Sequence, residues 1–207
     1  MTRRFHRPAH LDPLKADELP GGADPATRKE AAHETARILL SRARAEAPTD
    51  PALLARLRAL VETEGVETLA QLWADAPADS LPGALWRVYL LREHVRVDPT
   101  LADRYRLGAP LAEVPNAIAG AAPPPGPAEL RALADAILTG VFTGDFGLAL
   151  NRASAFARVL AVGSAADANL LDSEEAAARD TREAARFLTM SDDLAKAAAS
   201  WKVGTLD

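Results

Sequence analysis

The segment with the most side chains capable of chemistry is SLPGALWRVYLLREHVRVDP, residues 80–99. Its charged and aromatic members could bind a ligand or a partner: Trp86, Arg87, Arg92, His94 and Asp98. On a helix, His94 and Asp98 are one turn apart and can hydrogen-bond, and Arg87 shares their side. A His–Asp pair is half of an array that activates a nucleophile, but no Gly-x-Ser-x-Gly elbow accompanies it. These residues therefore predict a binding site, without a catalytic signature.

Arg92 needs a separate explanation, because it falls on the apolar side of the same helix with Leu85 and Val88. A desolvated guanidinium must be paired with a carboxylate, or its stem must carry it to water. Two interpretations remain open. Arg92 either forms a buried Arg–carboxylate bridge that ties helices together, or it is an anion site or partner anchor that acts with Trp86.

The chain lacks the residue patterns of common metal and cofactor sites. It has no Cys, which excludes disulfides, thiolate nucleophiles and Cys-ligated zinc or iron–sulfur clusters. Glu30 and His33 resemble half of a di-iron carboxylate site, but no second Glu-x-x-His is present. Phosphate-binding loops and dinucleotide fingerprints are also missing. We therefore predict no cofactor and a protein that is not an enzyme.

The elements that position these residues are predicted to be helices. Hydrophobic residues make up 48% and charged residues 26% of the chain, as in ordinary globular proteins. Alanine, the best helix former, is abundant, and β-branched residues are sparse. Ser80 is expected to cap the helix of the opening segment, and Asp98-Pro99 to end it. The predicted fold class is therefore all-α, a helical bundle.

Proline and glycine divide this bundle into predicted regions. Residues 1–24 lack periodicity and form a disordered basic arm. Residues 25–107 form an N-terminal helical bundle, and residues 127–207 form a C-terminal helical lobe. The Pro-rich residues 108–126 connect them. The two lobes could be separate or share a core.

The C-terminal lobe is predicted to begin with a helical hairpin, over residues 127–142 and 145–161. After Gly163, residues 164–171 are expected to form a connector. The next helix starts with acidic residues in its first turn, which suits the helix dipole. It either restarts near Ser191 or continues as one long helix to Trp201.

The charge distribution bears on partners and location. A formal net charge of −5 provides no global field that attracts nucleic acid or anionic membranes. Arg3, Arg4 and Arg7 make a local basic patch that could grip an acidic partner or a phosphate backbone. The N-terminus lacks the apolar region of a signal peptide, and no stretch approaches the roughly 18 apolar residues of a membrane span. We expect a cytoplasmic protein with no membrane partner.

Three functions remain open at this stage. The leading hypothesis is a non-enzymatic interaction or regulatory protein with a protein partner. The second is a small-ligand or enzymatic pocket between the lobes. The third is transcription-associated nucleic-acid binding, with Asn151, Arg152, Ser154 and Arg158 of the hairpin facing a groove; the acidic chain disfavours it. An Ala-rich helix face could also support a homo-oligomer.

Two strings, LPGALWRVYLLREHVR and ADAILTGVFTGDFGLALNRASAFARVLA, resemble segments of an uncharacterised family of small all-helical proteins from GC-rich bacteria. The resemblance covers most of residues 80–160. Some members of that family carry names that invoke RNA polymerase, but no polymerase catalytic motif is present here. The resemblance implies a bacterial cytoplasmic protein and assigns no site residue.

Overall fold

The computed structural model describes residues 24–40, 66–114, 126–143, 145–170 and 173–207. Within these ranges every regular element is a helix and no strand occurs, which confirms the all-α prediction. The predicted arm, including Arg3, Arg4 and Arg7, and most of the Pro-rich connector lie outside the described residues. The helices in chain order are α2 (Pro25–Leu40), α4 (Val66–Trp73), α5 (Leu81–Val97), α6 (Leu101–Gly108), α8 (Pro127–Thr143), α9 (Phe146–Ala168) and α10 (Glu174–Lys202).

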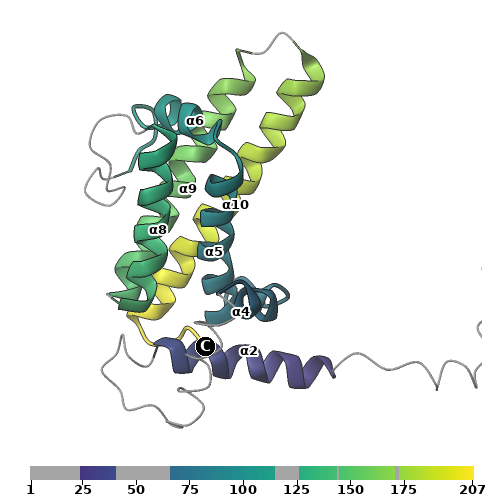
Figure 1. Ribbon diagram of the computed structural model, residues 1–207, viewed down its shortest axis with the longest axis vertical. Coiled ribbons are helices and arrows are strands. Elements are labelled where there is room, and N and C mark those ends of the chain that lie inside the picture. Colours follow the sequence, from purple (N-terminus) through teal and green to yellow (C-terminus); the bar gives the residue numbers. More distant parts are fainter. Residues whose placement is uncertain (1–23, 41–65, 115–125, 144, 171–172) are drawn as a thin grey trace, which may run out of the picture.

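Four helices run along the length of the molecule, and shorter ones cross its ends. Figure 1 shows α5, α8, α9 and α10 side by side, with α2 across one end and α6 across the other. The antiparallel pair α9 and α10 extends beyond the other helices at the α6 end. Because α5 packs against α2, α4, α8, α9 and α10, it is central, and the residues of its first turn, Leu81 to Leu85, are buried.

A single hydrophobic core joins the two predicted lobes. It includes Ala36 of α2, Leu85 of α5, Tyr105 of α6, Leu160 of α9 and Leu194 of α10, all of them almost completely buried. Within this core, the ring centroids of Tyr105 and Phe156 lie 5.2 Å apart. The N-terminal and C-terminal helices therefore stabilise each other through shared apolar burial.

Local sequence signals set the limits of α5. The Ser80 hydroxyl accepts a hydrogen bond from the Gly83 N–H (3.2 Å), which satisfies one of the free amides of the first turn. At the other end, Asp98 is extended and its own N–H donates to the His94 carbonyl (3.0 Å). Pro99 favours that extended conformation in the residue before it. Both predicted ends of this helix are confirmed.

The predicted connector after Gly163 is wrong for residues 164–168, because α9 continues through Gly163 to Ala168. Gly163 marks a close helix crossing. A Cβ atom there would overlap the backbone carbonyl of Arg104 in α6, and one at Gly108 would overlap the carbonyl of Val159 in α9. Glycine is needed at both positions so that the two backbones can approach.

Of the two interpretations of the last helix, the structure has the continuous one. α10 runs unbroken from Glu174 to Lys202, and Ser173 caps its first turn. Ser191 is buried in the middle of α10, and its carbonyl accepts a hydrogen bond from the Ser154 hydroxyl of α9 (2.9 Å). Ser191 therefore holds the α9–α10 pair together and does not start a new helix.

Candidate functional site

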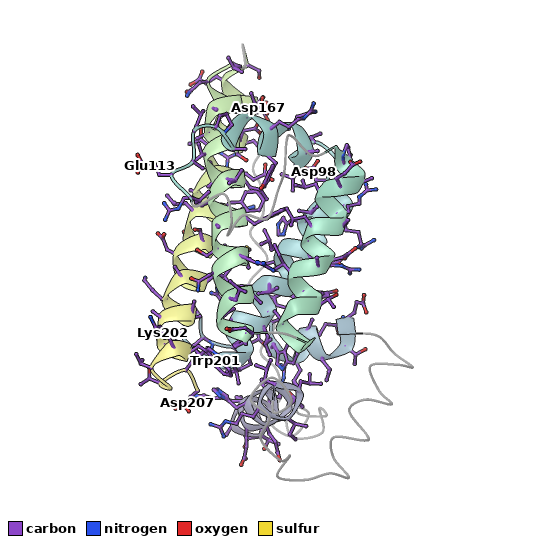
Figure 2. The ribbon with its side chains drawn as sticks, turned by 90° about the vertical axis from the view of Figure 1, so that its left-hand side faces the viewer. Asp98, Glu113, Asp167, Trp201, Lys202 and Asp207 are labelled. Carbon is purple, nitrogen blue, oxygen red and sulfur yellow. The ribbon has the colours of Figure 1, made fainter. Side chains whose placement is uncertain are left out.

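An open groove of about 1350 Å³ follows α5 and α10. Its lining runs from Trp86 to Asp98 on one side and from Arg179 to Asp193 on the other. Asp98 and Asp167 lie at the same end of the molecule, far from Asp207 at the α2 end (Figure 2). We call this feature the α5–α10 groove. Its walls are antiparallel, because Arg87 meets Asp193 while His94 meets Phe187.

The floor of the α5–α10 groove is apolar. It is made by Trp86, Leu90, Phe187 and Met190, and of these Phe187 is 2% exposed. Trp86 stacks on Tyr89, with ring centroids 5.7 Å apart, so its indole is held against α5. A floor of large apolar side chains, fixed by the core beneath, favours an occupant with an apolar face of its own.

An interhelical ion pair lies near one end of the groove. Arg87 Nε donates to the Asp193 carboxylate of α10 at 2.9 Å, and Arg87 Nη1 donates to the Gly83 carbonyl at 3.0 Å. Both charged side chains are mostly buried. Arg87 therefore has its donors engaged in joining α5 to α10.

The other end holds a cluster that sequence reasoning missed. Arg104 of α6 is 6% exposed and contacts three carboxylates, those of Asp167 (3.3 Å), Asp180 (3.0 Å) and Glu183. Burial acts to lower the pKa of Arg104, but the attraction of Glu183 and Asp180 outweighs it and raises that pKa above its ordinary value. The carboxylates come from α9 and α10, so no local pattern around Arg104 could have revealed the cluster.

The α5 wall presents His94 and Asp98. His94 Nδ1 lies 2.7 Å from the Leu90 carbonyl; because a carbonyl only accepts, Nδ1 carries the proton and Nε2 is the acceptor in neutral His94. The Asp98 carboxylate accepts hydrogen bonds from the N–H (2.9 Å) and hydroxyl (2.6 Å) of Thr100. His94 and Asp98 therefore bond to Leu90 and Thr100, and not to each other as the sequence suggested.

The α10 wall presents two arginines that the sequence analysis did not single out. Arg182 and Arg186 are exposed and line the groove one helical turn apart. Neither makes an ion pair or a hydrogen bond with any described residue, whereas Arg87, Arg104 and Arg179 all have carboxylate partners. The cationic charge at the middle of this wall is therefore uncompensated within the described part of the chain.

Arg92 does not line the groove. Its Nε donates to the Asp135 carboxylate of α8 at 2.8 Å, and its Nη1 contacts Glu93 at 2.5 Å. The bond to Asp135 raises the pKa of Arg92 above its usual value, against the opposing effect of burial. Glu93 also contacts Arg96 at 2.7 Å. The contact with Asp135 joins two helices, as in the first interpretation, but it is not buried, because the Asp135 side chain is 55% exposed.

Four predicted residues, Trp86, Arg87, His94 and Asp98, thus come together in one groove, while Arg92 lies elsewhere. The predicted recognition face of the hairpin is also divided. Ser154 and Arg158 of α9 bond to Ser191 and Asp192 of α10, so they face a neighbouring helix.

These features define an all-helical protein with an open groove between two antiparallel helices. Comparisons with models of protein families, with curated proteins and with solved structures found no match to this chain. Among the described residues, no group of three or more His, Cys, Asp and Glu side chains could hold a metal ion. The described helices include none that is long and apolar enough to cross a membrane.

Proposed function

We propose that this protein is a non-enzymatic cytoplasmic binding protein that receives a segment of a protein partner in the α5–α10 groove. The observation that carries the proposal is an apolar floor beside two arginines, Arg182 and Arg186, that have no carboxylate partner among the described residues. A ligand that covers the partly exposed Trp86, Leu90 and Met190 and neutralises these cations would gain both hydrophobic and charge-assisted contacts.

The size of the groove favours a protein segment over a small molecule. Ligand pockets usually measure about 300–1,000 Å³ and enclose most of their ligand. This groove measures about 1350 Å³ and runs along α10 from Arg179 to Asp193. At 1.5 Å per residue that distance is about 21 Å, or four helical turns. A long segment of polypeptide fills a groove of this length better than a compact metabolite does.

The charge of the lining argues against nucleic acid. Five arginines line the groove, and five carboxylates balance them: Asp98, Asp167, Asp180, Glu183 and Asp193. A phosphate backbone needs a surface with a net positive charge, because its affinity comes from neutralised phosphates and released counterions. The local cationic pair instead suits a ligand with a small number of acidic groups.

Site-specific photo-crosslinking tests the proposal. The photoreactive residue p-benzoylphenylalanine replaces Thr189, which lines the groove, or Thr181, which does not. Both threonines are exposed on α10, and both donate a hydrogen bond to the carbonyl four residues earlier, so they are matched controls. In cells that produce the protein, we expect one discrete protein adduct from position 189 and none from position 181. Equal adducts at both positions, or none at position 189, would contradict the proposal.

A further inference from the structure

We infer that the occupant of the α5–α10 groove is an amphipathic helix with an acidic pair four residues apart. This inference rests on the proposed function and deepens it by naming the partner's structure and charge. It combines three observations: the antiparallel helical walls, the absence of free backbone groups along them, and the spacing of Arg182 and Arg186.

The walls offer side chains and no backbone hydrogen bonds. An extended peptide would need main-chain partners, as it finds at the edge of a sheet. In α5 and α10 the amides and carbonyls along the groove are paired within their own helices. A helical ligand brings a backbone that is already satisfied, and it can pack its apolar ridge between the side chains of α5 and α10.

The length of the groove agrees with such a ligand. The ion pair Arg87–Asp193 lies toward one end, and the Arg104–Glu183 contact lies toward the other. The α10 positions 183 and 193 are ten residues apart, which is about 15 Å along the helix axis. A helix of about three turns fits between these two ion pairs and leaves both intact.

The charges of the two walls specify how the helix is oriented about its axis. Residues four apart on a helix have Cβ atoms about 5–6 Å apart, so an acidic i, i+4 pair matches the spacing of Arg182 and Arg186. The opposite wall carries the Asp98 carboxylate, which repels acidic groups placed on that side. The acidic pair therefore belongs on the flank that faces α10, beside an apolar face over Leu90 and Met190.

A displayed peptide library tests this assignment on the full-length protein. Each 18-residue helical peptide has leucine along one face and an equal mixture of Glu and Lys at every position that flanks it. Panning against the wild-type protein should enrich Glu about tenfold over Lys at two positions four residues apart on one flank only. On the variant Arg182→Glu/Arg186→Glu the preference at these two positions should reverse to Lys.

The matched control is Arg152→Glu/Lys196→Glu. It changes the net charge by the same amount, and it uses exposed cations outside the groove lining. This control should keep the wild-type preference for Glu. If this control also loses the preference for Glu, the preference reflects overall charge, and the inference is overturned. An enrichment that Arg182→Glu/Arg186→Glu leaves unchanged, or a failure of any peptide to enrich on the wild type, also overturns it.

A second copy of this chain is the other occupant to exclude. Sedimentation equilibrium that shows a dimer sensitive to Arg182→Glu/Arg186→Glu would assign the groove to self-association and overturn the inference. The crosslinking experiment separates the two levels of the argument. If photoreactive position 189 forms adducts but the library shows no charge preference, the proposed function stands and the acidic helix is rejected. If position 189 forms no adducts in the otherwise wild-type protein, the proposed function itself is rejected.

Discussion

Gly163 of α9 lies directly against the backbone carbonyl of Arg104 in α6. A Cβ atom at Gly163 would overlap the carbon and oxygen of that carbonyl, which are backbone atoms and cannot rotate away. This close crossing carries the Arg104 side chain over α9 to Asp180 and Glu183 of α10. The end of the α5–α10 groove thus depends on a residue that has no side chain.

Replacing Gly163 with alanine should therefore destabilise the protein. The added methyl group forces α6 away from α9, and overpacking of this kind costs about 1–3 kcal/mol. Gly140→Ala is the control, because a Cβ atom there meets only the Ala149 methyl at 3.8 Å, an ordinary contact. It should be neutral, or stabilising by up to about 1 kcal/mol through helix propensity. Urea denaturation followed by circular dichroism measures both; similar free energies of unfolding for the two variants would disprove the role of the crossing.

The pairing of Arg104 with Asp180 makes a second prediction. Arg104→Met leaves the Asp180 carboxylate, 1% exposed, with only the exposed Arg179 as a cation. An uncompensated buried charge costs about 3–5 kcal/mol, so the free energy of unfolding should fall by that order. The double variant Arg104→Met/Asp180→Leu should regain most of the loss, because both buried charges are gone.

Arg179→Gln is the control for this cycle. Its partner is the same carboxylate, but its own side chain is 68% exposed, so the loss should stay below about 1 kcal/mol. Chemical denaturation of the wild type, Arg104→Met, Asp180→Leu and the double variant gives the coupling energy between Arg104 and Asp180. A double variant no more stable than Arg104→Met alone would show that the cluster acts through packing and not through charge.

The features that the sequence predicts are those set by interactions between residues close together in the chain. The limits of α5 follow from Ser80 and from Asp98-Pro99, whose effects act within one turn. The convergence of Arg87, His94 and Asp98 follows from helical spacing along one segment, whereas Trp86 was expected to act with Arg92. Such local rules were sufficient for the fold class and for one wall of the groove.

The other wall required contacts between distant segments. A glycine in the sequence is compatible with a helix end and with a close helix crossing. Only the position of α6 shows that Gly163 has the second role. Arg104 meets its carboxylates across 63 to 79 positions of sequence. Arg182 and Arg186 resemble any solvent-exposed arginines until α5 is placed opposite them. Tertiary packing, which no short pattern encodes, gives these residues their roles.

A third prediction concerns acid sensitivity through His33 of α2. Its Nε2 is buried and has no hydrogen-bond partner among the described residues. Burial, and then the charges of Arg37 and Lys29, lower the pKa of His33 below 6.5. As the pH falls below 6.5, the unfolded chain therefore binds a proton at His33 more readily than the folded protein does. The free energy of unfolding should decrease with falling pH in this window.

His33→Leu should remove this part of the pH dependence. The slope of the free energy of unfolding against pH, below pH 6.5, should become smaller than in the wild type. Arg37→Gln should reduce the slope only in part, because burial, the larger cause, remains. Denaturation curves recorded across this range supply the slopes, and identical slopes for His33→Leu and the wild type would refute the assignment.

The last prediction distinguishes Arg92 from Arg182 and Arg186 by their effects on stability and on crosslinking. Arg92→Gln breaks the contact between α5 and Asp135 of α8, and it should lower the free energy of unfolding by about 1 kcal/mol. Because Arg92 lies outside the groove, the adduct yield from photoreactive position 189 should not change. Arg182→Glu/Arg186→Glu should have the opposite pair of effects. Stability should be maintained, because these exposed arginines have no described partner to lose, and the adduct should be lost.

Melting temperatures and adduct yields, measured on the same preparations, test both expectations. An Arg92 variant that remains stable but loses the adduct would show that Arg92 belongs to the binding surface as a partner anchor.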